Sequence, residues 1–251
     1  MLTSIQNERV KLVHALQNQT KTRRKERKMA LEGLRLIEDA LANGVIPDFI
    51  LFDPDVLDAR TFRKLPSEKV IAAASDVLRH ISDTEQPQGV VGVFPMPSSK
   101  LPTPLTRVLV CDAIRDPGNL GTILRTAAAA SIEAVLLSPD CVDPYNPKVL
   151  RAGMGAHFRL AIAEHAWDAI RTYCGDLPIY LADMVGDVRY DQADWSRYAL
   201  IVGSEAHGSS AEAEALATHT VYIPMQDNAE SLNAAIATGI LLFEANRHAL
   251  T

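Results

Sequence analysis

From residue 107 onward, short apolar runs alternate with segments that have the apolar spacing of helices. The runs lie near residues 107–111, 134–137, 178–181, 199–202 and 221–223. Continuous apolar strands of this kind are typical of a parallel sheet that helices cover on both faces. The helices are predicted over 118–131, 147–156 and 231–248. The pattern therefore predicts an α/β fold, whose ligand binds where the strands end.

A proline-dense stretch divides the chain in two. Proline removes a backbone donor and disfavours helix in the residue before it, so residues 98–106 are predicted to be a linker. It separates a first domain, 1–97, from a second, 107–251. Within the first domain, helices are predicted over 4–17 and 29–43, and strands near 49–52, 70–73 and 90–93. A length of 251 residues suits two domains of roughly 100–200 residues each.

The net charge of −6 conceals a strong asymmetry. The first thirty residues carry eight Lys or Arg and two Glu, whereas the other 221 carry 17 basic and 29 acidic residues. An acidic body with a basic arm is typical of a protein that meets a polyanion at one end, although a basic run can also be a solvated helix face. We predict phosphate contacts for the six cations Lys21, Arg23, Arg24, Lys25, Arg27 and Lys28.

Several classes of protein are excluded or disfavoured. A composition of 47% hydrophobic and 22% charged residues is that of a globular chain. The sequence has no apolar run near the roughly 18–20 residues of a membrane span and no secretory signal, so we expect a cytoplasmic protein. Three cysteines without CxxC spacing, and histidines far apart, argue against disulfides and against a metal site.

The common cofactor and hydrolase motifs are also missing. The nearest match to GxGxxG is Gly153-Met-Gly155, with Phe158 in place of the third glycine, so a dinucleotide-binding oxidoreductase is weakly supported. Neither a GxxxxGK[ST] loop nor a GxSxG elbow occurs.

Three loops at predicted strand ends carry unusual polar residues. In the first, Asp116-Pro-Gly-Asn119 opens a helix, and Arg125 lies off the apolar stripe of that helix, where a surface charge is the alternative reading. In the second, Gly203 permits a close approach of the backbone, and Glu205 lies at a strand end, although an ordinary turn would look similar. The third leads to Ser231 and Asn233, where serine is a good N-cap.

The last predicted helix is unusually apolar. Between Ala234 and Phe243 only Thr238 is polar. We therefore expect this helix to be buried nearly all round, by the sheet and by a second subunit.

In this order and spacing, the three loops resemble the three motifs of the SpoU–TrmH family of RNA ribose 2′-O-methyltransferases, in the SPOUT superfamily. Asp116-Pro-Gly-Asn-Leu-Gly with Arg125 is similar to the first motif, Gly203-Ser-Glu205 with Gly208 to the second, and Ile223-Pro-Met225 with Ser231-Leu-Asn to the third. Residues 151–156 resemble a further family segment, with Gly153 where serine is usual. The front half, at 32–33, 36–38 and 83–90, is similar to the substrate-binding domain often fused ahead of the catalytic one.

This resemblance implies a deep trefoil knot in the second domain and a ribosomal-protein-like RNA-binding first domain. It implies that S-adenosyl-L-methionine is the cofactor, that no metal is needed, and that the protein is a homodimer. The substrate would be RNA, with ribosomal RNA favoured over transfer RNA because two-domain members more often modify ribosomal RNA. The alternatives are a transfer-RNA methyltransferase and an inactive RNA-binding protein of the same fold. The residues expected to bind the cofactor are Gly203, Ile223, Met225 and Leu232, and Arg151 joins the residues expected to contact RNA.

The chemistry expected from the resemblance needs a positioned and activated ribose hydroxyl, because a 2′-hydroxyl is a poor nucleophile. Arg125 is expected either to clamp the target phosphate and stabilise developing negative charge, or to act as a base. The first role suits a guanidinium better, since its pKa lies above about 12. The full expected catalytic set is Arg125, Asn119, Glu205, Ser231 and Asn233.

Overall fold

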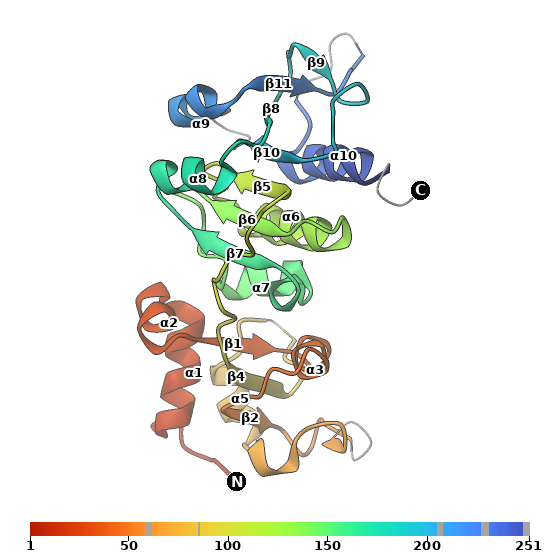
Figure 1. The fold of residues 1–251 in the computed structure, drawn as a ribbon. Coiled ribbons are helices and arrows are strands. Elements are labelled where there is room, and N and C mark those ends of the chain that lie inside the picture. The colour runs from red at the N-terminus through yellow and green to blue at the C-terminus, as the bar shows by residue number, and fades with distance from the viewer. Residues whose placement is uncertain (59–61, 85, 205–207, 227–230, 248–251) are drawn as a thin grey trace. The chain divides into compact units, whose positions relative to one another are not determined.

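The computed structural model describes residues 1–58, 62–84, 86–204, 208–226 and 231–247. The chain divides into two compact units, Met1–Pro97 with Tyr145–Phe158, and Ser98–Pro144 with Arg159–Thr251 (Figure 1). The sequence analysis placed 145–158 in the domain 107–251, but this segment groups with the first unit. The reason is packing, because Leu150 is buried in the apolar core of that unit.

The first unit is a three-layer arrangement around a four-stranded sheet in the order β1-β4-β2-β3. Strand β4 runs antiparallel to β1 and β2, and β2 runs parallel to β3. Helices α1 and α5 cover one face, and α3 and α7 cover the other. The element bounds are α1 Glu8–Asn18, α2 Thr20–Glu26, β1 Lys28–Glu32, α3 Leu34–Ala42, β2 Phe49–Phe52, η1 Ser67–Lys69, β3 Val70–Ala72, α5 Ser75–His80, β4 Val90–Pro95, α7 Pro147–Gly153 and η2 Ala156–Phe158.

The predicted helix over 29–43 is wrong in its first part. Lys28–Glu32 forms β1, which pairs along its whole length with β4, and Gly33, with φ +94°, separates it from α3. Met, Ala, Leu and Glu all favour helix in isolation. Here the pairing buries Met29, Ala30 and Leu31 in two core layers, so tertiary packing overrides the local preference.

The second unit contains a seven-stranded sheet in the order β7-β6-β5-β10-β8-β11-β9, in which every pair of neighbours is parallel. The predicted α/β fold with a mostly parallel sheet is confirmed, and β7 and β9 are strands that the sequence analysis did not predict. The bounds are β5 Arg107–Cys111, β6 Ala134–Leu137, β7 Ala161–Glu164, β8 Ile179–Asp183, β9 Val188–Arg189, β10 Tyr198–Val202 and β11 His219–Tyr222.

Helices cover both faces of this sheet (Figure 1). Helices α8 (Trp167–Cys174) and α9 (Ala211–Leu216) bury their apolar residues against one face. Helices α6 (Pro117–Ala129) and α10 (Ala234–Arg247) lie on the other and pack against each other. No helix in the described part of the chain is long and apolar enough to cross a membrane.

Helix α10 is not buried all round in the single chain, and its predicted burial by a second subunit stays a prediction. Ile236 and Phe243 are 56% and 52% exposed, and they are seven residues apart, so they share one face of the helix. The buried Thr238 satisfies its hydroxyl locally, by donating to the carbonyl of Ala234 at 2.6 Å. The helix thus has an apolar face that the described residues leave open.

Candidate functional site

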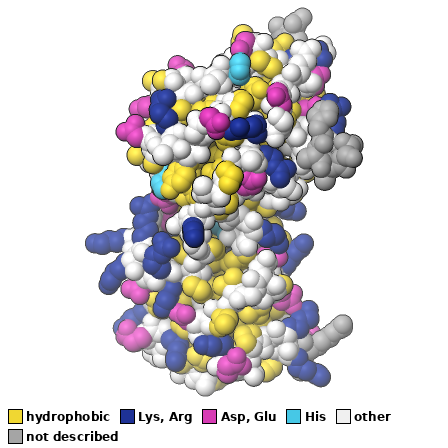
Figure 2. Space-filling model, in the orientation of Figure 1, with side chains coloured by type: hydrophobic (Ala, Val, Ile, Leu, Met, Phe, Trp, Pro, Cys, Tyr) yellow, Lys and Arg dark blue, Asp and Glu magenta, His cyan; other side chains and the backbone are white. Residues whose placement is uncertain are grey.

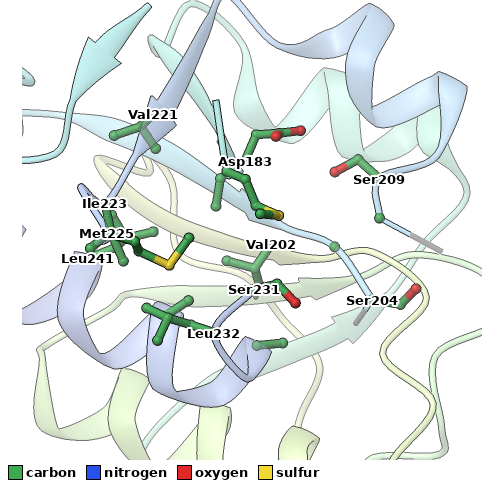
Figure 3. Close-up of a pocket in the computed structure, with 16 residues that line it drawn as sticks. Asp183, Val202, Ser204, Ser209, Val221, Ile223, Met225, Ser231, Leu232 and Leu241 are labelled. Carbon is green, nitrogen blue, oxygen red and sulfur yellow. The ribbon is translucent and has the colours of Figure 1, made fainter. Parts of the chain in front are cut away.

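A pocket of about 300 Å³ lies where three neighbouring parallel strands end. Strands β10, β8 and β11 are adjacent and point the same way, so their carboxyl ends open on one edge of the sheet. The start of α10 closes the pocket from the side (Figure 3). The lining residues are Ala182, Asp183, Met184, Val202, Gly203, Ser204, Gly208, Ser209, Val221, Ile223, Met225, Ser231, Leu232, Ala234, Ala237 and Leu241.

The four residues that the sequence analysis expected to bind the cofactor all line this pocket, and so does Ser231 from the expected catalytic set. The lining is chemically two-sided (Figure 3). Ile223, Met225 and Leu241 lie on one side, and Asp183, Ser204 and Ser209 on the other. An elongated ligand with one apolar and one polar end fits such a lining.

Gly203 is required by a close contact between backbones. A Cβ on Gly203 would lie 2.7 Å from the carbonyl oxygen of Gly208. Ser204 and Gly208 exchange two backbone hydrogen bonds, at 3.1 and 3.0 Å, which close the second loop tightly. Gly208 itself has φ +67°, a conformation that favours glycine. The two glycines therefore let the two ends of the second loop lie this close at the pocket.

The buried carboxylate of Asp112 ties the first loop to the second. Asp112 follows β5 and is 2% exposed. Its Oδ2 accepts a hydrogen bond from the backbone N–H of Ser210 at 2.7 Å, and its Oδ1 accepts one from the hydroxyl of Ser138 at 3.3 Å. The backbone N–H of Asp112 also donates to the carbonyl of Val202 at 2.9 Å. These bonds hold the ends of β5 and β10 and the exit of the second loop in one arrangement.

A pair of asparagines joins the first and third loops. The side-chain Nδ2 of Asn233 donates to Oδ1 of Asn119 at 3.1 Å. Asn119 lies in the first turn of α6, where its backbone N–H is capped by Asp116 at 2.7 Å. Oδ1 of Asn233 accepts from the backbone N–H groups of Ala235 and Ile236, so Asn233 caps α10. Ser231, the alternative cap in the sequence analysis, lies before the helix and lines the pocket instead.

Arg125 lies on α6, six residues beyond Asn119, with an exposed side chain. Among the described residues it has no hydrogen-bond or ion-pair partner, and it is not part of the pocket lining. Its guanidinium is therefore available to an anionic ligand. Glu205, the remaining expected catalytic residue, lies outside the described residues.

The expected RNA-contacting cations divide into three groups: one buried, four exposed and two half-buried. Arg23 is 2% exposed and donates to the carbonyl of Leu16 at 2.6 Å and to the hydroxyl of Thr20 at 2.9 Å. It caps the end of α1, so its predicted phosphate contact is corrected to a structural role. Lys21, Arg24, Lys25 and Arg27 are exposed.

Two further expected RNA-contacting residues are half-buried and paired with carboxylates. Lys28 contacts Asp48 at 2.7 Å, and Arg151 contacts Asp83 at 2.8 Å. Each of these cations is partly neutralised within the first unit, so neither offers a full positive charge to a phosphate.

The cysteines are not activated as nucleophiles. Burial raises the pKa of Cys111 well above its usual value, and it raises the pKa values of Cys141 and Cys174 to about 11. All three thiols are thus protonated near neutral pH. Within the described ranges, no group of three or more His, Cys, Asp or Glu is placed to hold a metal ion.

The sequence analysis assigned no role to two carboxylates of this site. Asp183 is the last residue of β8, and Asp112 is the first residue after β5. Both follow apolar strands that the sequence analysis predicted, so a polar residue at each predicted strand end was the available signal. Asp112 begins the first of the three loops, four residues before Asp116, but no role was predicted for it, and Asp183 lies outside all three loops.

Comparison with known proteins agrees with this geometry. Residues 106–243 match the sequence model of the SpoU rRNA Methylase family. The chain belongs to this family. Residues 7–92 match the MRM3-like substrate binding domain, so the expected two-part organisation of a SpoU methylase with a substrate-binding region ahead of it is confirmed.

Curated relatives extend over nearly the whole chain. The chain is 34% identical to the human "rRNA methyltransferase 3, mitochondrial", over 90% of this chain and 69% of the relative. It is 32% identical to the "23S rRNA (guanosine(2553)-2'-O)-methyltransferase RlmP" of Bacillus subtilis, over 96% of this chain and 97% of the relative.

A solved structure matches the fold along the full length. The SpoU methyltransferase AviRb from Streptomyces viridochromogenes, in complex with the cofactor AdoMet, aligns with a TM-score of 0.88 and 27% identity. The alignment covers 98% of this chain and 99% of that one.

We predict that Gly203→Ala opens the second loop. The new Cβ would lie 2.7 Å from a backbone oxygen, so the Ser204–Gly208 pairing must break or shift. Hydrogen exchange of the Ser204 and Gly208 amides is expected to speed up at least about tenfold, the ratio for about 1.4 kcal/mol. The matched control is Gly239→Ala in α10, whose Cβ would meet only a methyl of Thr126 at 3.7 Å. Unchanged exchange in Gly203→Ala would contradict the close-approach argument.

Proposed function

We propose that this protein transfers a methyl group from S-adenosyl-L-methionine to a ribose 2′-hydroxyl of ribosomal RNA. The observation that carries the proposal is the pocket at the ends of β8, β10 and β11, which collects all four expected cofactor residues in a chain of the SpoU rRNA methylase family. The curated relatives named as rRNA methyltransferases support ribosomal RNA over transfer RNA. A cytoplasmic location stays a prediction.

The residues of the pocket fit this cofactor. A volume of about 300 Å³ is at the lower end of the range for small-molecule sites, and the lining is apolar on one side and polar on the other. Gly203, Ile223, Met225 and Leu232 would hold the cofactor, largely through backbone groups and apolar contact. When bound, S-adenosylmethionine supplies an electrophilic methyl group on a positively charged sulfur. We infer further that the chain around this pocket is knotted, as the family resemblance implies.

The chain's own residues would position the ribose and stabilise charge. We propose that the exposed Arg125 binds the phosphate beside the target nucleotide and stabilises negative charge as it develops on the ribose oxygen. A base role for Arg125 would need that phosphate, or Glu205, to relay the hydroxyl proton. Ser231 at the pocket and the bonded pair Asn119 and Asn233 would hold the ribose or the cofactor by hydrogen bonds.

The first test is methyl transfer by the purified protein. Methyl-labelled S-adenosylmethionine is offered with unmodified ribosomal RNA and transfer RNA in separate reactions, and nuclease digestion with mass spectrometry identifies the product. A 2′-O-methylnucleoside from ribosomal RNA alone is expected. A product from transfer RNA would support the alternative substrate, and bound cofactor without any product would support an inactive RNA-binding protein.

We predict that Arg125→Ala lowers the rate of methyl transfer at least about a hundredfold, the usual cost of removing one group that stabilises transition-state charge. Its affinity for S-adenosylmethionine, measured by calorimetry, should stay within about twofold, because Arg125 lies outside the pocket lining. Arg125→Lys keeps the charge but loses the planar fork, and we expect it to recover only part of the rate. A large loss of cofactor affinity in Arg125→Ala would place this residue in the cofactor pocket instead.

We propose that the first unit binds RNA partly through the exposed cations of the basic run. Dark blue side chains gather over the region of α2 in the space-filling view (Figure 2). Helix α2 ends at Glu26, and Arg27 follows it in a left-handed conformation, with φ 54°.

Replacing Lys21, Arg24, Lys25 and Arg27 together by Gln is predicted to weaken RNA binding and to flatten its salt dependence. Each lost phosphate contact should reduce the slope of log K against log salt by about 0.7 to 0.9. A fluorescence titration at several salt concentrations measures that slope. The matched control neutralises four cations elsewhere in the same unit, Lys11, Arg35, Lys64 and Arg79. Equal slopes for the two variants would show that the basic run is a solvated helix face that makes no phosphate contacts of its own.

We also propose that the protein is a homodimer that packs through the open face of α10. Ile236 and Phe243 lie half-exposed on that face, and burying such a patch is favourable. Sedimentation at micromolar concentration should give a dimer, and the double variant Ile236→Glu with Phe243→Glu should give a monomer. Ile46→Glu, at an equally apolar but 71% exposed position of the first unit, should stay dimeric. A monomeric wild type would contradict this proposal.

A further inference from the structure

The pocket holds one charged side chain among its described lining residues, and it is acidic. The lining consists of apolar side chains, glycines and the hydroxyls of Ser204, Ser209 and Ser231, apart from Asp183. In Figure 3 the carboxylate of Asp183 points toward the side of the pocket where Ser209 lies. A ligand in this pocket therefore meets the negative charge of Asp183 on its polar side.

The backbone around Asp183 is held firmly, so this charge has a defined place. Asp183 is the last residue of β8 and pairs with Tyr222 of β11. Its Oδ1 accepts the backbone N–H of Val185 at 3.2 Å. The other oxygen, Oδ2, has no hydrogen-bond partner among the described residues and is open to a ligand.

The turn that follows is anchored to β11 as well. A Cβ on Gly186 would lie 2.7 Å from the carbonyl oxygen of Thr220, so the two backbones touch. Asp187 accepts hydrogen bonds from the hydroxyl and the backbone N–H of Thr220, at 2.7 and 2.6 Å, and these bonds lower the pKa of Asp187 to about 2. The carboxylate of Asp187 is thus committed to the turn, whereas that of Asp183 is directed to the pocket.

We propose that Asp183 makes the pocket prefer the sulfonium cofactor over its demethylated product. At neutral pH, S-adenosylmethionine carries a sulfonium, an ammonium and a carboxylate, for a net charge of +1. S-adenosylhomocysteine has the same adenosine and amino-acid groups but no sulfonium, so its net charge is zero. The carboxylate of Asp183 attracts the first ligand more than the second. This inference rests on the proposed function and adds a specificity-determining residue to it.

The expected size of the preference is modest, because Asp183 is exposed to solvent. Exposed charge pairs contribute little, and partly desolvated pairs contribute more. We therefore expect Asp183 to account for a preference of about three- to tenfold. The pocket then favours the reactive cofactor and releases the product more readily after each turnover.

The test measures both dissociation constants by calorimetry, for the wild type and for Asp183→Asn, in the full chain. In Asp183→Asn, the Kd of S-adenosylmethionine should rise about three- to tenfold, while that of S-adenosylhomocysteine should change less than about twofold. The wild-type preference should also shrink as salt is raised from about 0.05 to 0.5 M. The matched control, Asp176→Asn, makes the same change of net charge before the opposite end of β8, where Asp176 pairs with Arg197, and it should leave the ratio unchanged.

A parallel loss of affinity for both ligands would overturn the inference, because Asp183 would then contact the adenosine or amino-acid groups that the two share. Unchanged affinities would also overturn it. A wild type that binds neither ligand would overturn the proposed function itself. The two failures are therefore distinguishable.

Discussion

The parallel pairing of β10 between β5 and β8 is the constraint on which the site depends. It aligns the ends of β5, β10, β8 and β11 at one edge of the sheet, so loops far apart in sequence meet there. The buried carboxylate of Asp112 then fixes the ends of β5 and β10 to one another, through the N–H of Ser210 and the carbonyl of Val202. Because a buried carboxylate is costly without hydrogen bonds, any shift of this edge would leave it unsatisfied. All the hydrogen bonds of Asp112 can therefore form in only one arrangement of the strand ends that border the pocket.

The sequence patterns predicted the sheet and the residues of the pocket, but they did not predict the local roles of single residues. The apolar runs predicted β5, β6, β8, β10 and β11, because strands covered on both faces are continuously apolar and stand out from the helical spacing around them. Residues 28–32 were predicted incorrectly, because their helical propensity yields to a pairing partner, β4, that lies some sixty residues away. Likewise, nothing in the spacing distinguishes Arg23 from Arg24, since only the folded chain shows which of them reaches the free carbonyls at the end of α1.

The asparagine pair shows how a residue can serve both the fold and the site. Asn233 caps α10 with its oxygen and bonds Asn119 with its nitrogen, so the start of α10 is fixed against the start of α6. Leu232 and Ser231, directly before this cap, are thereby held at the pocket. Arg125 extends from the same helix as Asn119, outside the pocket lining. The proposed cofactor pocket at the strand ends and the exposed Arg125, proposed to bind an RNA phosphate, thus lie on separate elements, and the hydrogen bond between Asn233 and Asn119 links the helices that carry them.

The two expected ligands, RNA and S-adenosylmethionine, carry opposite net charges, and the chain has a basic part and an acidic part that suit them. The first thirty residues are strongly basic, and the remaining 221 carry 29 acidic against 17 basic residues. A polyanion is attracted to the former and repelled by much of the latter, whereas a small cation experiences the reverse. The pocket belongs to the acidic part of the chain, and Asp183 is the one charged side chain in its described lining. The charge asymmetry of the sequence thus has a local counterpart in the described pocket lining, the carboxylate of Asp183, which we propose distinguishes the charged cofactor from its neutral product.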